Sequence, residues 1–440
     1  MSETWFQSYA RTAVLAALRR IQHGRIVVIS KYRDGGEREV LGEPEENGES
    51  SREVSIVFKN PNAWVRICQG FDVGITPKGF AEAFMFQELD CDNLAGLFAL
   101  YIANRGRLGF STGSILQRAI PQVMRLVFQP TNDLTHAKMN ASFHYDTSNV
   151  LFSSFLSADM NYSSAIWSQD KDESLEAAQE RKIQTLLGKA RISATDHVLD
   201  IGCGWGHLAI EAVKKTGCRV TGVTLSAEQR QLAQERIREA GLEDKITILL
   251  CDYRQVPRPE GGFDRIISVE MLEHVGDKFM NEYFASISSL LKDKGGVMVI
   301  QGITFIKPIR NNSPGVDTFI DRYVFPGGYL PTVSQLLSSI DVGSQGTLEV
   351  ETVQSIGPHY IKTLQCWREN FLHNWDTIKA NYISKNPDAD EEVIEAYRRR
   401  WLYYFFYCEA GFRARIIGDY IISAVRTPEE VIDGEPVYST

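Results

Sequence analysis

Near the start of the chain, hydrophobic positions change from helical to alternating spacing. Residues 3–22 place apolar side chains on one face, which predicts an amphipathic helix. The β-rich runs Gly24–Ser30 and Glu37–Leu41 predict two strands, because the glycines between them suit a hairpin turn. Val54–Phe58 predicts a third strand, and Asn60–Pro61 predicts that a helix follows it. We therefore expect a small α+β domain up to about residue 130.

Further along, patterns typical of buried strands alternate with helical ones. The predicted strands after the first one, which ends near Asp200, are Arg219–Thr224, Ile246–Leu250, Phe263–Val269 and Gly296–Ile303. Such alternation is typical of an α/β fold with a parallel sheet. Residues 304–405 are too many for a loop, so we expect them to form a cap over the strand ends. The tail, Gly411–Arg426, is expected to return a helix and the last strand to the sheet.

The central motif is Val198–Gly206, V-L-D-I-G-C-G-W-G, in which a predicted strand runs into a glycine-rich turn and then a helix. Glycine suits such a turn because a Cβ keeps the backbone away from a ligand and disfavours positive φ. The helix N-terminus behind the turn offers unpaired N–H groups to an anion. Similar turns hold dinucleotides or merely pack a strand on a helix, so this motif alone leaves the ligand open.

Polar residues follow the next two strands. Thr224, Leu225 and Gln229 come after the second strand, and Asp252 and Tyr253 come after the third. Taken singly, each is more often a cap or turn former. Together they suit an adenosine whose ribose contacts Thr224 and Gln229 and whose adenine lies between Asp252 and Tyr253. The set resembles the core of S-adenosylmethionine (SAM) methyltransferases more than an NAD-binding fold.

In this interpretation, Gly202 and Gly204 approach the methionine part of SAM. The cofactor-binding residues expected at the strand ends and the turn are Asp200, Gly202, Gly204, Gly206, Thr224, Leu225, Gln229, Asp252 and Tyr253.

Composition narrows the class of partner. A net charge of −9 over 440 residues argues against a nucleic-acid partner. The seven cysteines form no C-x-x-C pair, which favours reduced thiols in the cytoplasm. No apolar run is long enough to span a bilayer and no signal peptide is evident, so we expect a cytoplasmic protein that contacts a membrane surface transiently and peripherally. No cluster has metal-ligand spacing, so we expect no metal.

Further motifs occur in a characteristic order along nearly the whole chain. They are His144–Tyr145–Asp146, Tyr162–Ser163, the glycine turn, Val223–Gln229, Glu273–Gly276, Phe325–Pro331, Tyr360 and Gly411–Arg415. Their order resembles that of the cyclopropane-fatty-acyl-phospholipid synthase family. Val57–Leu97 is similar to the lipid-binding N-terminal domain of that family, while Gln301 and the Cys366–Phe371 segment are closer to its eukaryotic members.

The resemblance implies a Rossmann-like SAM-dependent methyltransferase domain over residues 131–440, with a seven-stranded sheet and a helical cap inserted at about 304–405. Residues 1–130 would form the lipid-binding domain. The implied substrate is an unsaturated fatty acyl chain of a phospholipid, whose double bond takes the methyl group of SAM. A base then removes a proton from the new methyl group, and the ring closes. The resemblance alone implies that Tyr162 and Ser163 reach the carboxylate of SAM and that the protein forms a homodimer.

In much of that family the base is a bicarbonate held by a Cys, a Glu, a His and a Tyr. Glu273 and Tyr360 match this pattern, but Ser164 replaces the Cys and Gln301 replaces the His. A hydroxyl and a carboxamide still bind an anion, so bicarbonate stays an expected ligand. Glu270 stands where many bacterial members carry Gly, and a second carboxylate there would raise one pKa and create a base within the protein. Either Glu270 replaces or assists bicarbonate, or it satisfies a backbone turn.

Three further questions stay open. His274 is either a catalytic group or the hydrogen-bonded support of Glu273. Loss of a proton from the new methyl group gives a cyclopropane, whereas loss from a chain carbon gives a methyl-branched or methylene product. A small-molecule C- or N-methyltransferase and an inactive lipid-binding protein are the rival functions. The apparent N-terminal domain argues against the first, and retention of Glu273 and Tyr360 argues against the second.

Overall fold

The computed structural model describes residues 3–33, 35–43, 53–70, 78–108, 148–305 and 318–427. The chain forms two compact units, each made of several segments. Unit 1 comprises Met1–Phe155, Lys307–Pro326 and Leu364–Ile416, and unit 2 comprises Leu156–Ile306, Gly327–Thr363 and Ile417–Thr440. The motif His144–Tyr145–Asp146 lies outside the described residues. In the described ranges, no helix has the length and apolar character that crossing a membrane requires.

Unit 1 opens with the elements that the hydrophobic pattern predicts. Strand β1 (Gly24–Ser30) pairs antiparallel with β2 (Glu37–Glu43) and parallel with β3 (Glu53–Phe58). Its four-stranded sheet has the order β2-β1-β3-β4. The other elements of unit 1 are α1 (Trp5–Leu18), α2 (Asn62–Gly70), α3 (Lys78–Met85), β4 (Leu89–Cys91), α4 (Leu94–Leu108), α7 (Asn149–Phe155), α13 (Phe319–Tyr323), α16 (Trp375–Lys385) and α17 (Glu391–Arg413).

Helix α17 packs against the N-terminal helices within unit 1. Tyr403 of α17 meets the rings of Phe80 and Phe84 from α3 and of Phe98 from α4. Arg399 donates to the carbonyl of Phe84 and forms an ion pair with Asp90 at 2.9 Å. A late segment of the chain therefore shares one core with the first hundred residues or so. The domain boundaries expected from the sequence remain predictions.

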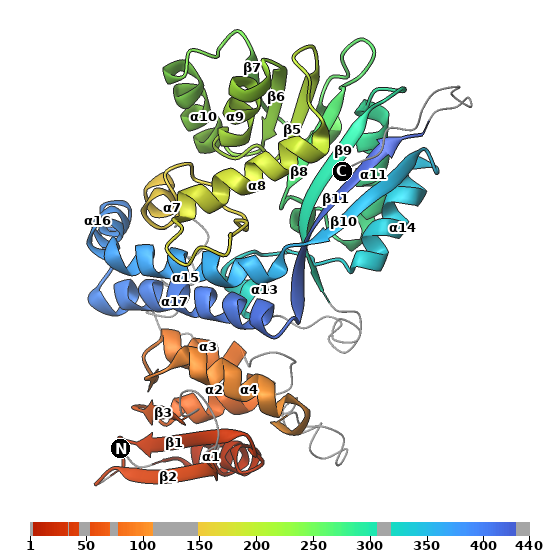
Figure 1. The fold of residues 1–440 in the computed structure, drawn as a ribbon. Helices are drawn as coiled ribbons and strands as arrows, with labels where there is room; N and C mark the ends of the chain where they lie inside the picture. Colours follow the sequence, from red (N-terminus) through yellow and green to blue (C-terminus); the bar gives the residue numbers. More distant parts are fainter. Residues whose placement is uncertain are drawn as a thin grey trace. The chain divides into compact units, whose positions relative to one another are not determined.

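Unit 2 is built on a seven-stranded sheet of order β10-β11-β9-β8-β5-β6-β7 (Figure 1). Its strands are β5 (His197–Ile201), β6 (Arg219–Thr224), β7 (Ile246–Leu250), β8 (Arg265–Val269), β9 (Val297–Phe305), β10 (Leu348–Ser355) and β11 (Ile417–Arg426). Neighbouring strands from β5 to β9 are parallel, whereas β11 runs antiparallel to both β9 and β10. The expected α/β fold with a Rossmann-like methyltransferase sheet is confirmed.

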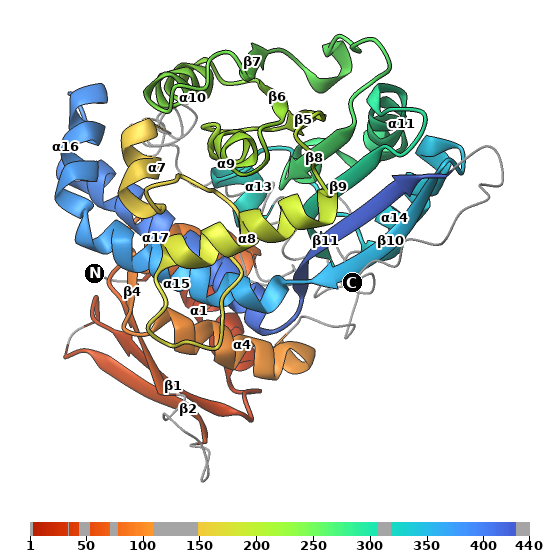
Figure 2. The same ribbon diagram turned by 45° about the horizontal axis from the view of Figure 1, so that its top comes forward.

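Helices cover both faces of this sheet, because the buried strands are apolar on both sides. Helices α8 (Leu175–Ala190), α9 (His207–Thr216) and α10 (Ala227–Glu239) pack on one face. Helices α11 (Met280–Leu290) and α14 (Val333–Ser344) pack on the other. Figure 2 shows α8 crossing the sheet on the face that α9 also covers. Helix α15 (Gly357–His373) begins in unit 2 and continues into unit 1.

One element differs from the expected cap. Strand β10 lies within residues 304–405, yet it pairs with β11 and forms the edge of the sheet. Its residues alternate between inward and outward positions, as expected for an edge strand with one solvated face. The alternation L-E-V-E-T-V-Q-S was therefore the signal of a strand, which the length of the segment obscured.

Candidate functional site

The glycine turn lies at the carboxyl end of β5. The backbone N–H groups of Gly202 and Cys203 both donate to the carbonyl of Val223, each at 3.0 Å, which fixes the turn against the end of β6. Helix α9 starts directly behind the turn, with Gly206 as its N-cap. The turn and a helix N-terminus thus meet at the sheet edge where α/β proteins bind their ligands.

The three glycines serve different purposes, although all have positive φ. A Cβ on Gly202 would lie 3.1 Å from the Met271 side chain, and one on Gly206 would lie 3.1 Å from Ala233. Both positions are therefore closely packed. A Cβ on Gly204 would meet no described atom within 4 Å, so the space beside this residue is open. Of the three, Gly204 is the one that leaves room for a ligand.

Asp200 at the end of β5 supports the expected cofactor site. Its side chain is 2% exposed, and Oδ2 meets no hydrogen-bond donor within the described parts of the chain. Burial raises the pKa of Asp200 to about 7, against the opposing charge of Lys182. A buried acceptor without a donor costs free energy, and an ammonium or hydroxyl group of a ligand would supply one. The open space at Gly204 and this acceptor fit the polar end of SAM.

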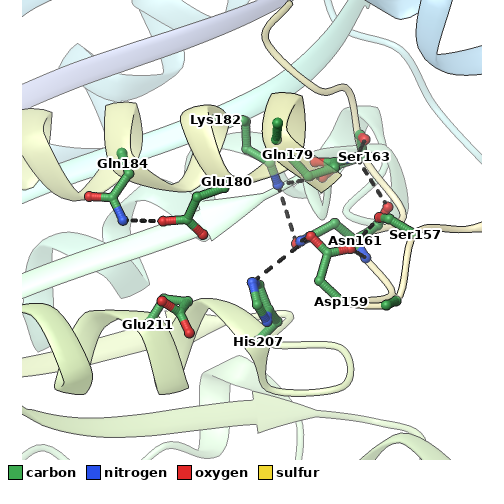
Figure 3. A network of polar contacts seen from close by, with 12 residues as sticks. Ser157, Asp159, Asn161, Ser163, Gln179, Glu180, Lys182, Gln184, His207 and Glu211 are labelled. Carbon is green, nitrogen blue, oxygen red and sulfur yellow. Dashed lines mark hydrogen bonds and ion pairs between the residues drawn. The ribbon is translucent and has the colours of Figure 1, made fainter. Parts of the chain in front are cut away.

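A buried lysine organises the segment that carries the predicted Tyr162–Ser163 motif. Lys182 of α8 is 1% exposed, and its Nζ donates to Ser163 Oγ at 2.9 Å and to Asn161 Oδ1 at 3.4 Å. Asn161 donates through Nδ2 to Asp159 Oδ2 at 2.6 Å, and His207 approaches the same carboxylate at 3.9 Å (Figure 3). Ser163, expected to reach the carboxylate of SAM, is therefore held beside a buried cation. The partly buried Tyr162 precedes it.

Of the predicted residues at the ends of β6 and β7, Thr224 is buried, whereas Gln229 and Asp252 are partly exposed. Thr224 donates to Gln229 Oε1 at 2.7 Å, whereas Leu225 between them is 75% exposed. Asp252 accepts hydrogen bonds from Arg254 Nε at 2.8 Å and Nη2 at 2.9 Å, and these bonds lower its pKa.

Tyr253, the expected adenine neighbour, is partly buried and packs edge-to-face on Tyr283 with ring centroids 5.1 Å apart. The predicted contacts of these residues with a ribose and an adenine remain predictions.

Four predicted residues meet at the carboxylate of Glu270. Its Oε1 accepts from the Ser164 N–H and from Gln301 Nε2, both at 2.9 Å. Its Oε2 accepts from the Tyr360 hydroxyl at 2.7 Å. Burial raises the pKa of Glu270, while the Tyr360 and Ser164 hydrogen bonds and the charge of Lys182 oppose this rise. These donors belong to residues that the resemblance assigns to an anion site, although Ser164 donates through its backbone N–H while its hydroxyl donates to the Ala165 carbonyl.

Glu270 adopts a backbone conformation that favours glycine. Its φ is +47°, in the left-handed region, and its N–H donates to the carbonyl of Gln301 at 2.8 Å. A side chain in this region costs about 1 kcal/mol, and such strain is concentrated at functional sites. Burial and strain both disfavour this residue, so a backbone turn alone does not account for a glutamate here.

Glu273 lies one turn further along, in the short 3₁₀ helix Leu272–His274. Its Oε1 accepts from the Ile303 N–H at 2.6 Å, and no donor in the described ranges contacts its buried Oε2. Burial, followed by the charge of Glu270, raises the pKa of Glu273 to about 8. His274 is exposed, unlike the groups around Glu270. Its predicted role remains a prediction.

Two residues near Glu270 were not anticipated from the sequence. Lys182 stands among the buried positions of α8, and this single charge within an apolar stripe was a usable signal. Asp419 lies in β11 with 0% exposure, and its Oδ2 accepts from Gln301 Nε2 at 2.9 Å. An acid within the apolar run of β11 was equally visible, but its neighbours depend on the antiparallel return of that strand.

Comparison with known proteins identifies relatives over most of the chain. A family profile described as mycolic acid cyclopropane synthetase matches residues 132–420. The cyclopropane-fatty-acyl-phospholipid synthase of Escherichia coli is 35% identical over 374 residues, which cover 84% of this chain and 87% of the relative. The tuberculostearic acid methyltransferase of Mycobacterium tuberculosis is 34% identical over 360 residues, which cover 79% and 78%.

Solved structures agree with these matches. A mycolic acid cyclopropane synthase crystallised with SAH and CTAB aligns with a TM-score of 0.55 and 31% identity, covering 65% of this chain and 97% of that chain. A cyclopropane synthase from Mycobacterium tuberculosis aligns with a TM-score of 0.55 and 29% identity, covering 67% of this chain and all of that chain. Sequence and fold therefore point to the same group of proteins.

Proposed function

This chain belongs to the mycolic acid cyclopropane synthetase family, and we propose that it converts a double bond of an unsaturated phospholipid acyl chain into a cyclopropane. The family consists of SAM-dependent methyltransferases that act on lipid chains, so the chain is an enzyme and SAM is its methyl donor. The phospholipid, the ring and transient contact with a membrane surface are the parts that we propose.

The arrangement around Glu270 carries the proposal. Its carboxylate accepts hydrogen bonds from Ser164, Gln301 and Tyr360, the residues that stand at the bicarbonate-binding positions of the family pattern. Glu270 thus offers its own carboxylate where much of the family is expected to bind a separate anion. We infer that Glu270 is the base.

The chemistry requires an electrophilic carbon, a base and exclusion of water. When bound, SAM supplies a methyl group on a sulfonium. The π electrons of the double bond form the new C–C bond as the C–S bond breaks, which leaves a carbocation on the acyl chain. Glu270 takes a proton from the new methyl group, and the electrons of that C–H bond close the ring. Its raised pKa suits this task because a stronger base is available near neutral pH.

The function is tested with the full chain, SAM and vesicles of a phospholipid that carries one cis-unsaturated chain. The expected product gains the mass of one CH₂ group and loses its double bond, as measured by mass spectrometry of the released acyl chains. Gas chromatography separates a ring from a methyl branch. A branched or methylene product would contradict the cyclopropane assignment, and no SAM-dependent gain on any acyl chain would overturn the lipid function.

The role of Glu270 is tested with two variants, assayed with and without added bicarbonate. Glu270→Gly removes the carboxylate and the backbone strain, so we expect its activity to depend on bicarbonate. Glu270→Gln fills the same space without a basic group, so bicarbonate should not rescue it. The wild type is expected to be independent of added bicarbonate. Full, bicarbonate-dependent activity of Glu270→Gln would show that Glu270 is not the base.

A further inference from the structure

Asp419 is fully buried and lies next to Glu270, the proposed base, because both side chains accept a hydrogen bond from Gln301. Gln301 Nε2 donates to Glu270 Oε1 and to Asp419 Oδ2, both at 2.9 Å, so one amide nitrogen bridges the two carboxyl groups. The charge of Glu270 also raises the pKa of Asp419, so the two carboxyl groups are linked electrostatically as well as through this amide. Glu270 keeps part of its surface accessible, whereas Asp419 has none. Asp419 therefore cannot touch a substrate and can act only through Glu270.

The register of the sheet explains this placement. Asp419 pairs with Ile303 and Gln301 pairs with Ile421 across β11 and β9. Paired residues of antiparallel strands point to the same face, so both polar side chains emerge on the face that α8 covers. The charge of Lys182 in α8 acts on Asp419.

The charges that face Asp419 do not balance if every acid is ionised. Glu270 faces Asp419 from the end of β8 and Glu273 faces it from the 3₁₀ turn, while Asp159 and Asp200 face Lys182. Tyr360 of α15 contacts Glu270 as a neutral donor. Among the described residues that contribute to this cluster, Lys182 supplies the positive charge, and its hydrogen bonds go to Ser163 and Asn161. Like charges this close cannot all persist, so the cluster must retain protons.

Hydrogen bonding decides which acid carries the negative charge. Glu270 accepts from the Ser164 N–H, the Gln301 amide and the Tyr360 hydroxyl. Asp419 accepts from Gln301 through Oδ2, and its buried Oδ1 meets no N–H or O–H donor from the described chain. Donors stabilise a carboxylate, and a carboxyl group with few donors is more stable when it is protonated. The charge therefore belongs on Glu270 and a proton on Asp419.

We propose that Asp419 is a positioning residue that stays a neutral carboxylic acid and donates its hydrogen bond to Glu270, thereby keeping Glu270 ionised as the base. This inference rests on the proposed role of Glu270. It assigns Asp419 a role that a carboxamide can reproduce and an apolar side chain cannot, because a carboxamide also has a donor and an acceptor without a charge.

Two variants separate these roles. Asp419→Asn is expected to keep kcat within about threefold of the wild type and to leave the acid limb of the kcat–pH profile in place. Asp419→Leu removes the donor, so kcat should fall about tenfold at neutral pH and the acid limb should move up by about one pH unit. The KM for SAM should change little in either variant. A kcat for Asp419→Asn as low as that of Asp419→Leu, or an unchanged Asp419→Leu, would overturn the inference.

A measurement without turnover keeps this result apart from the proposed function. The infrared spectrum of the wild type near pH 7 should contain C=O absorption from protonated carboxyl groups, to which Glu273 and Asp200 also contribute, and Asp419→Asn should lack the part that belongs to Asp419. Asp264→Asn is the matched control, because the Asp264 carboxylate pairs with Lys292 at 2.8 Å and should contribute no such band. Persistence of the whole band in Asp419→Asn would overturn the inference. A wild type that converts no lipid would overturn the proposed function, while the band would still report whether Asp419 is protonated.

Discussion

Asp252 and Glu270 each follow a parallel strand of the same sheet, but their surroundings treat the carboxylate in opposite ways. The Asp252 side chain is 25% exposed, and hydrogen bonds from Arg254 lower its pKa. Glu270 contacts the buried residues Ser164 and Gln301, and burial raises its pKa. One strand end holds a carboxylate whose charged form is stabilised, and the other holds a carboxyl group whose affinity for a proton is raised.

Under the proposed function, this contrast separates cofactor binding from proton removal along one edge of the sheet. A carboxylate fixed by a guanidinium suits a hydrogen bond to a ligand, because its charge does not depend on pH over the working range. A carboxylate without a guanidinium, supported by neutral donors and a neighbouring acid, suits removal of a proton. The order of the strands places these two carboxylates three positions apart, with β5 and its glycine turn and β6 between them.

The largest expected effect comes from removing each charge in turn. Glu270→Gln should lower kcat by about a hundredfold to ten-thousandfold, the usual contribution of a general base, and leave the Kd for SAH nearly unchanged. Asp252→Asn should raise the Kd for SAH by about tenfold and leave kcat at saturating SAM nearly unchanged. Calorimetric titration and steady-state kinetics measure both quantities. Equal losses of kcat in the two variants would contradict the division of roles.

The next largest effect concerns the cations that accompany the two acids. Lys182→Met should lower the free energy of unfolding at pH 7 by about 3 kcal/mol, because it leaves buried acids without a compensating charge. Arg254→Met should leave stability nearly unchanged, since its ion pair with Asp252 lies at the surface. Denaturant titrations followed by circular dichroism measure both. A loss for Lys182→Met no larger than that for Arg254→Met would mean that Lys182 does not stabilise the cluster.

The sequence predicted those features of this sheet edge that depend on local patterns, namely the strands β6 and β7 and the glycine turn. Arg219–Thr224 and Ile246–Leu250 are strands with the predicted bounds, because short apolar runs between turn residues leave few alternatives. The glycine turn was equally clear, since three glycines alternate directly after a short apolar run. The meeting of Ser164, Glu270 and Tyr360 could be proposed only from the family pattern, because these residues are far apart in the chain.

Positions that depend on tertiary topology were missed. The neighbours of Asp419 follow from the antiparallel return of β11, which the spacing of apolar residues does not reveal. The buried position of Lys182 was not predicted, because a lysine at this helix position can pack its methylene groups against the core while its ammonium group reaches polar atoms. Strand β10 was assigned to the cap because its segment was judged by length rather than by its alternation. In each case the sequence contained a local signal, either a charged residue in an apolar segment or an alternating pattern. The residue or strand that it contacts could not be identified from the sequence.

Glu273 is expected to have a smaller effect, on how the free energy of unfolding changes with pH. Its pKa rises from an ordinary value of 4.5 to about 8, so the folded state binds a proton more tightly than the unfolded state between these values. This contribution to stability is present at low pH and is lost as pH rises, by about 1.4 kcal/mol per pH unit. Glu273→Gln should flatten that decline in thermal unfolding measured from pH 5 to 8. Asp252→Asn removes a carboxylate whose pKa is lowered in the folded state, so its small loss of stability should be constant from pH 5 to 8 and should disappear only at acid pH. A wild-type decline that persists unchanged in Glu273→Gln would contradict the assignment.

The smallest expected effect sharpens the binding half of the comparison. Gly204→Ala places a Cβ in open space at positive φ, so we expect about 1 kcal/mol of lost stability and an increase of about tenfold in the Kd for SAH. Gly241→Ala is the matched control, because Gly241 also has positive φ and open space but lies in the turn between α10 and β7. Both variants should lose similar stability in thermal unfolding, and only Gly204→Ala should weaken binding in calorimetry. If both variants bound SAH equally well, the open space beside Gly204 would not belong to the cofactor, and the contrast between a binding end and a chemical end of the sheet would have to rest on Asp252 alone.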